Sequence, residues 1–157
     1  MNTFRRTAFV LTACLGLAAL AAQAKPNFTG DWKLSAAKSD FAQFPAPSSL
    51  TQKVTHEEPS LKVSAKVTTD NGDMNFDGIY KTDGVETTNQ FGPNEMKSKA
   101  GWDGDSLSVT SKGQFGDAEV TITDKWDLSA DGKTLTMSRH WSSSMGEMDQ
   151  KMVLEKQ

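Results

Sequence analysis

From Leu50 to the end of the chain, the sequence repeats one pattern: short runs of alternating apolar and polar residues, separated by residues that favour turns. Such alternation indicates β-strands that bury one face, and Asp-Gly pairs between the runs are typical of tight hairpins. No run has the spacing of an amphipathic helix. The predicted strands span about residues 50–57, 61–69, 74–82, 85–91, 94–102, 105–115, 118–128, 133–143 and 147–156.

Tight hairpins would fix which residues lie opposite one another on neighbouring strands. A slip of one residue would turn the apolar side chains outward, so the apolar pattern tests the turn positions. With turns at the breaks, the apolar side chains of each hairpin share one face, and so do Trp32, Trp102, Trp126 and Trp141. The predicted opposed pairs are Leu128 with Leu135, Trp126 with Met137, Ile122 with Trp141, Leu107 with Trp126, Trp141 with Met148, Leu135 with Leu154, Val54 with Val63, Val67 with Phe76, Ala100 with Leu107, Ser98 with Val109, Tyr80 with Thr87 and Phe76 with Phe91.

The opposite face of the predicted sheet carries mainly Thr, Ser, Lys, Glu and Asp. About ten successive antiparallel strands with no helix to cover the apolar face must curl onto themselves, which also removes the exposed edges. The sequence therefore predicts a single all-β, up-and-down meander barrel whose first strand pairs with the last. An apolar interior with a polar exterior is the reverse of an outer-membrane barrel.

The first strand, Phe28 to Leu34, places Gly30 two residues before Trp32, and a glycine there leaves room for the large ring. Gly-x-Trp on the first strand resembles the signature of the calycin superfamily, which comprises lipocalins, fatty-acid-binding proteins and avidins. A ten-stranded meander whose only long connection follows the first strand resembles the fatty-acid-binding branch. The chain after residue 24 also resembles exported bacterial lipocalin-like proteins. The resemblance implies a barrel with a binding-type role.

Two features of the fatty-acid-binding branch are missing. The segment from Ala36 to Ser49 is too short for the two helices of that branch and contains two prolines. Its Phe41 and Phe44 could form a lid over the barrel mouth or a permanent plug. The carboxylate-binding Arg-x-Tyr of the last strand is also absent, so only the Gly30/Trp32 motif transfers from the family to this chain.

Residues 1–24 have the anatomy of a signal peptide. Arg5 and Arg6 precede an apolar run, and Ala22-Gln23-Ala24 supplies small residues for cleavage. Cleavage there leaves residues 25–157 as one β-barrel domain, periplasmic or secreted. As an alternative, Leu11-Thr12-Ala13-Cys14 resembles a lipobox, which would make Cys14 a lipid anchor.

The charge and the cysteine content of the chain limit its partners. Loss of Arg5 and Arg6 with the signal peptide changes the formal charge from −3 to −5, which argues against a nucleic-acid partner. The apolar run near the N-terminus is too short to predict a membrane span. Cys14 is the only cysteine, and the two histidines have opposite parity on their strands, so no metal site and no cofactor are predicted.

Polar residues on the predicted inner face are candidate binding residues, because an unpaired buried polar group is costly. The register places Asp124 opposite Arg139, and Arg139 opposite Gln150, while Asn89 falls opposite Ser98 and His56 also points inward. Asp124 and Arg139 could be an ion pair that fixes register. Alternatively, Arg139, held by Asp124 and Gln150, offers its other donors to a carboxylate or polar headgroup. The apolar walls would then include Trp102, Trp126, Met137 and Trp141, which could equally be core filling.

The pattern favours a binding protein for a small, largely apolar or amphipathic ligand. An alternative is a protein partner: some exported calycin-like barrels inhibit proteases through an N-terminal segment, and Lys25-Pro26-Asn27 could act in that way. His56 is interpreted as a histidine at the barrel rim. An enzyme built around His56 and Asp124 is the least favoured hypothesis, because their strands are far apart in the meander, and no catalytic set is recognised.

Overall fold

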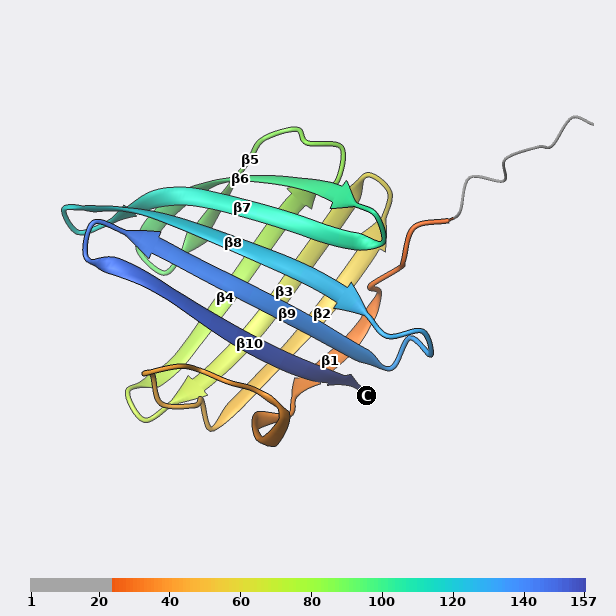
Figure 1. Cartoon of the computed structure of the whole chain (residues 1–157), viewed down its shortest axis with the longest axis horizontal. Coiled ribbons are helices and arrows are strands. Elements are labelled where there is room, and N and C mark those ends of the chain that lie inside the picture. The colour runs from red at the N-terminus through yellow and green to blue at the C-terminus, as the bar shows by residue number, and fades with distance from the viewer. Residues whose placement is uncertain (1–23) are drawn as a thin grey trace, which may run out of the picture.

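A computed structural model describes residues 24–157, which form a ten-stranded antiparallel sheet that curls into a nearly closed barrel (Figure 1). The sheet order is β4-β3-β2-β1-β10-β9-β8-β7-β6-β5. Strands that are hydrogen-bonded neighbours are therefore consecutive in the chain, except that the first strand pairs with the last. The predicted all-β meander barrel is confirmed. The strands are β1 (Gly30–Leu34), β2 (Ser49–Glu57), β3 (Ser60–Thr69), β4 (Gly72–Lys81), β5 (Thr87–Phe91), β6 (Asn94–Asp103), β7 (Ser106–Phe115), β8 (Ala118–Leu128), β9 (Thr134–Ser143) and β10 (Gly146–Lys156).

One short helical turn, η1 (Ala36–Lys38), follows β1. Within residues 24–157, no helix is both long and apolar enough to cross a membrane. The predicted lipid-anchoring Cys14 and nearly all of the predicted signal peptide lie outside the described residues, so both stay predictions.

The strand register agrees with the predicted one at four hairpins and differs by two residues at three. Opposed pairs such as Trp126 with Met137 and Asp124 with Arg139 are confirmed. The predicted partners of Val67, Ala100 and Asn89 are wrong: these residues lie opposite Met74, Val109 and Met96, respectively. Each of these turns lies one residue from its predicted position. A turn displaced by one residue moves the pairing by two, which keeps every side chain on the predicted face.

The barrel is not fully hydrogen-bonded, because no backbone ladder joins β4 to β5 within the described residues. The predicted pairing of Tyr80 with Thr87 and of Phe76 with Phe91 as a tight hairpin is therefore wrong. The connection between the two strands pairs with β6 instead, through a bridge of Asp83 with Gly101. Phe76 and Phe91 still meet across the gap, with ring centroids 5.5 Å apart.

The seam between β1 and β10 closes the barrel as predicted, with Trp32 opposite Lys156. Trp32 is buried in the main core, and its indole donates to the carbonyl of Phe28 at 3.0 Å. A Cβ at Gly30 would lie 2.6 Å from Cε of Lys156, and the Lys156 ammonium lies 5.4 Å from the Trp32 ring centroid. Gly30 therefore makes room for the aliphatic stem of Lys156, which packs towards the tryptophan.

Beyond Leu34, the segment before β2 continues along the edge of β10 in place of β1. Asp40 and Lys151 exchange two backbone hydrogen bonds, and Ser35 donates to the carbonyl of Val153. Phe41 packs partly buried against the main core, whereas the side chain of Phe44 is 52 % exposed. The segment thus provides hydrogen-bond partners for backbone groups of β10 that lie beyond the end of β1. Neither phenylalanine lines the internal cavity described below, and a lid role stays a prediction.

Candidate ligand-binding cavity

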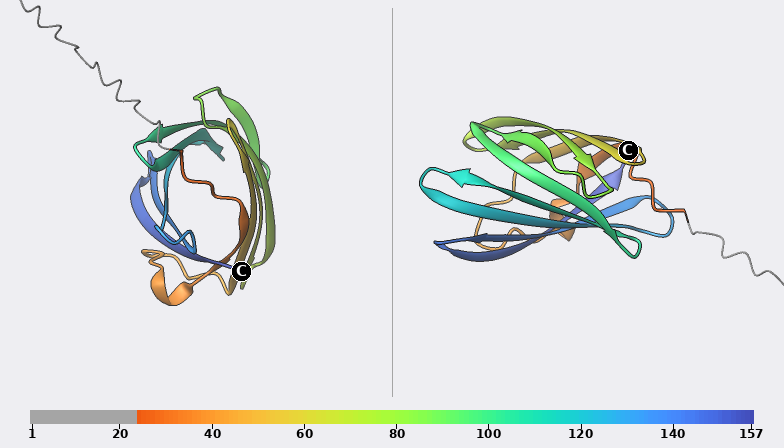
Figure 2. Two further views of the ribbon diagram at one scale, coloured as in Figure 1. Left: turned by 90° about the vertical axis from the view of Figure 1, so that its right-hand side faces the viewer. Right: turned by 90° about the horizontal axis from the view of Figure 1, so that it is seen from above.

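A cavity of about 510 Å³ lies inside the barrel and extends to the turns between β3 and β4 and between β5 and β6. Figure 2 shows the sheet curving around this interior. Most of the lining is apolar, and its residues come from nine strands, β2 to β10, since every second residue of a strand points inward. Its residues are Leu50, Val63, Val67, Asp73, Met74, Asn75, Phe76, Tyr80, Asn89, Phe91, Gly92, Pro93, Asn94, Met96, Ser98, Ser111, Phe115, Ile122, Asp124, Trp126, Met137, Arg139 and Met152.

The cavity brings together five of the predicted site residues: Arg139, Asp124, Asn89, Trp126 and Met137. The other four do not line it. Gln150, Trp102, Trp141 and His56 lie elsewhere, although they share the inward parity of the first five. The alternation of inward and outward positions therefore identified which residues face the interior, but not how far along the barrel each one lies.

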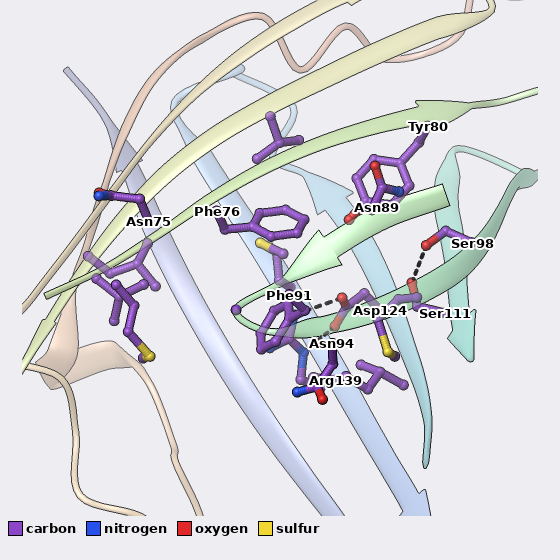
Figure 3. Close-up of a pocket in the computed structure, with 18 of the residues that line it drawn as sticks. Asn75, Phe76, Tyr80, Asn89, Phe91, Asn94, Ser98, Ser111, Asp124 and Arg139 are labelled. Carbon is purple, nitrogen blue, oxygen red and sulfur yellow. Dashed lines mark hydrogen bonds and ion pairs between the residues drawn. The ribbon is translucent and has the colours of Figure 1, made fainter. Parts of the chain in front are cut away.

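Arg139 and Asp124 form a bidentate ion pair in the cavity wall (Figure 3). Nε of Arg139 donates to Oδ1 of Asp124 at 2.7 Å, and Nη2 donates to Oδ2 at 2.8 Å. The two side chains are 20 % and 13 % exposed. Burial opposes the guanidinium charge, but the charge of Asp124 and its hydrogen bonds outweigh burial and raise the pKa of Arg139. Arg139 is therefore charged at neutral pH.

Gln150 does not hold Arg139, although the two residues are opposed in register as predicted. The amide of Gln150 donates instead to the carbonyl of Phe41, at 3.3 Å. Gln150 thus anchors the segment between β1 and β2. Residues opposed across a ladder share a face, but their long side chains can still lean apart.

Tyr80 is a cavity residue that the sequence analysis did not single out. It is buried, and its hydroxyl makes no hydrogen bond with another described residue. Burial, and after it the charge of Asp124, raises the pKa of Tyr80, while Arg139 opposes this effect. The available signal was its inward parity on a predicted strand, together with its being the only tyrosine in the chain.

Further polar groups are distributed around the apolar lining. The hydroxyls of Ser98 and Ser111 pair at 2.8 Å, as Figure 3 shows. The side-chain amide of Asn89 forms hydrogen bonds with the backbone of Ile79, so these bonds stabilise the wall of the cavity. Nε1 of Trp126 is buried and has no hydrogen-bond partner within residues 24–157. A buried donor without a partner calls for an explanation, and a ligand acceptor would provide one.

His56 and Trp102 lie near the start of the described chain, in a cluster with Phe28. The Phe28 ring stacks on both, at centroid distances of 5.7 and 5.9 Å. Nδ1 of His56 accepts from the Phe28 amide at 3.3 Å, and Nε2 lies 3.2 Å from Oε1 of Glu58. His56, the penultimate residue of β2, is therefore a buried residue that holds the N-terminal segment.

The carboxylate of Glu58 contacts three polar groups of this cluster, on His56, Thr82 and Trp102. It accepts from the Trp102 indole at 2.9 Å and from the Thr82 hydroxyl. Partial burial would raise the pKa of Glu58, but these two hydrogen bonds and the neighbouring His56 together lower it. The cluster fixes a tertiary contact between β2, β6 and the N-terminal segment.

The structure does not bring His56 and Asp124 into one site: no hydrogen bond or ion pair joins them in the described part of the chain.

Trp141, the remaining predicted wall residue, packs on Phe115 at 5.3 Å within a smaller cluster that contains Met96 and Ile122. Residues 24–157 hold no group of three or more His, Cys, Asp or Glu side chains placed to share a metal ion.

An up-and-down meander whose first strand pairs with the last strand is the fold of calycin-type β-barrels, and the comparison with solved structures confirms this fold. No family model and no curated protein matches the chain. Similar structures include a secretory abundant heat soluble protein from Ramazzottius varieornatus, with 15% identity, a TM-score of 0.57, and coverage of 85% of this chain and 98% of the other. Secretory abundant heat soluble protein 4 from the same organism has 15% identity, a TM-score of 0.58 and coverage of 87% and 99%.

Zebrafish ileal bile acid-binding protein, in a crystal structure with cholic acid, is also similar. It shares 14% identity with a TM-score of 0.56, over 83% of this chain and 98% of the other. At such low identity, these likenesses establish the fold.

Proposed function

We propose that this protein is a binding protein, not an enzyme, and that it holds a small, largely apolar ligand with one polar end inside the barrel. The observation that carries the proposal is the cavity of about 510 Å³, which is mainly apolar and has the ion pair of Arg139 with Asp124 in its wall. Ligand sites of roughly 300–1,000 Å³ with a few polar groups among apolar walls are typical of small-molecule binding. The cholic acid in the zebrafish structure is in keeping with such a role for this fold.

The proposed orientation follows from the positions of the polar groups. Arg139, Asp124 and Tyr80 would surround the polar end of the ligand. Phe76, Phe91, Phe115, Ile122 and Met152 would contact its apolar part, together with the predicted Trp126 and Met137. Trp102, Trp141, Gln150 and His56 are left out of this site, since none lines the cavity.

The test is uptake of an uncharged apolar dye, N-phenylnaphthylamine, by protein that has been stripped of lipid. The wild-type protein should bind the dye with a saturable rise in fluorescence. Ile122→Trp would fill the cavity and should abolish the signal, whereas Thr121→Trp, on the outer face of the same strand, should not. Circular dichroism checks that both variants keep the sheet. Absence of saturable uptake by the wild-type protein, or equal uptake by Ile122→Trp, would overturn the proposal.

The alternative of a protease inhibitor that acts through Lys25-Pro26-Asn27 receives no support from the contacts of that segment. Nζ of Lys25 donates to the carbonyl of Gly104 at 2.7 Å and lies 5.5 Å from the Trp102 ring centroid. Asn27 donates to the carbonyl of His56. These contacts hold the segment against the barrel, where its backbone is less free to enter a protease.

We also propose that the protein is exported and that residues 1–24 are removed. The support is the signal-peptide pattern of the sequence. Mass spectrometry of the protein from its own cells tests this: a mature chain that begins at Lys25 is expected. A chain that begins at a lipid-modified Cys14 would establish the anchored alternative.

A further inference from the structure

We propose that the cavity selects a ligand whose polar end is an uncharged oxygen, such as a hydroxyl or carbonyl, over a ligand that ends in a carboxylate. This inference rests on the proposed function, because it specifies the chemical class of the ligand at the same site. It departs from the carboxylate recognition that an arginine in such a barrel would suggest. The reason is the balance of charge around Arg139.

The lining contains a single cation, Arg139, among the described residues. Its charge is neutralised locally, because both oxygens of Asp124 accept from the guanidinium at 2.7 and 2.8 Å. The only other charged lining residue is Asp73, at the rim, where its carboxylate pairs with Lys66 at 2.8 Å. No uncompensated positive charge is therefore available to a ligand anion. An anion that enters would leave water without gaining a counter-charge.

The free donors of Arg139 lie beside Asp124. A guanidinium has five N–H groups, and the contacts with Asp124 use one on Nε and one on Nη2. A ligand carboxylate at the remaining N–H groups would approach the carboxylate of Asp124, and the repulsion would offset the attraction to Arg139. An uncharged oxygen can accept from the same N–H groups without that repulsion.

Two other cavity residues hold donors without partners. Tyr80 has a free hydroxyl, and the buried indole N–H of Trp126 donates to no described residue. A tyrosine with its ordinary pKa of about 10 is protonated at neutral pH, and the pKa of Tyr80 is raised further, so the hydroxyl remains a donor. These two donors share the cavity wall with the free N–H groups of Arg139. They match a hydrogen-bond acceptor that carries no net charge.

The experiment compares ligands of equal chain length by isothermal titration calorimetry of the delipidated protein at pH 7. The probes are 1-decanol, decanoate and decylammonium, which differ only in the polar end. Decanol should bind at least about tenfold more tightly than either charged probe, where tenfold corresponds to ~1.4 kcal/mol. Acidification should improve binding of the decanoic acid, because its protonated form is uncharged, and should leave decanol binding unchanged.

Removal of the compensating charge provides the second arm. Asp124→Asn leaves Arg139 as a net cation and should raise the affinity for decanoate by about tenfold or more, with little change for decanol. Asp77→Asn, on the exposed face of β4, makes the same change in net charge away from the cavity and should alter neither affinity. If Asp124→Asn does not fold, the double variant Asp124→Asn/Arg139→Gln restores neutrality and should keep the preference for decanol.

The outcomes separate the two proposals. Tighter binding of decanoate or decylammonium than of decanol by the wild-type protein would overturn the inference, while leaving the barrel a binding protein. Loss of the decanol preference in the neutral double variant would also overturn it. Failure of all three probes together with failure of N-phenylnaphthylamine to bind would overturn the proposed function itself.

Discussion

The side chain of Asn89 takes the place of a backbone ladder between β5 and β4. Its Oδ1 accepts from the amide of Ile79 at 2.7 Å, and its Nδ2 donates to the carbonyl of Ile79 at 3.1 Å. An amide side chain presents the same donor and acceptor as a peptide group. Asn89 therefore holds together the two strands that no ladder joins, and it does so in the wall of the cavity.

Replacement of Asn89 by aspartate should destabilise the barrel by about 1–3 kcal/mol, since a carboxylate cannot donate to the Ile79 carbonyl and would face it with a negative charge. Urea unfolding measures the loss, and amide hydrogen exchange at Ile79 should accelerate. Gln90→Glu, on the exposed neighbouring residue, is the matched control and should change stability by less than about 0.5 kcal/mol. Equal effects at the two positions would show that Asn89 does not join the strands.

Asp124 and Arg139 should be strongly coupled in a double-mutant cycle. Asp124→Leu or Arg139→Met alone should cost about 3–5 kcal/mol, because each leaves a buried charge unpaired. The double variant should cost much less than the sum of the two, as measured by urea unfolding. His140 and Asp149 form an exposed pair on neighbouring strands, and the same cycle there should give at most about 1 kcal/mol. Additive losses at Asp124 and Arg139 would contradict the ion pair.

Tyr80 should ionise well above the ordinary tyrosine pKa of about 10. Since the chain has one tyrosine, the ultraviolet absorbance of tyrosinate reports this group alone. The folded state keeps the proton longer than the unfolded state, so stability from Tyr80 is present below about pH 10 and is lost as the pH rises towards the folded pKa. Tyr80→Phe should remove that part of the alkaline destabilisation. A phenol that titrates in the native protein as it does in urea would contradict its burial beside Asp124.

Glu58 should make the protein sensitive to acid. Burial works against ionisation, but the hydrogen bonds from Thr82 and Trp102 and the nearby His56 hold the pKa of Glu58 below its usual range. The stability that this provides is present above the unfolded pKa of about 4.3 and is lost as the pH falls through the lower folded pKa. Thermal unfolding between neutral and acid pH should show a shallower loss for Glu58→Gln. Glu57→Gln, an exposed neighbour, should leave the profile of the wild-type protein unchanged.

The sequence by itself determined the strands, the inward face of each and the pairing of the first strand with the last. The strands and their faces follow from local physics: alternation with a period of two and turn residues at regular breaks. The pairing of the first strand with the last follows from the need to cover the apolar face and remove the exposed edges. Even where the predicted turns at three hairpins lay one residue away, the pairing moved by two and the face was kept. The opposition of Asp124 and Arg139 depended only on this register, and for that reason it could be predicted.

The tertiary structure alone decided that the barrel encloses a cavity and which inward residues line it. Parity places a side chain on the inner face, but the twist and stagger of the strands decide how far along the barrel it lies. His56 and Trp102 consequently join Phe28 in a packed cluster, while Tyr80 and Asn89 reach the cavity. The lean of Gln150 towards Phe41 and the gap between β4 and β5 depend on contacts between segments distant in sequence. Local sequence patterns do not predict such contacts, because these contacts form only when the strands come together in the barrel.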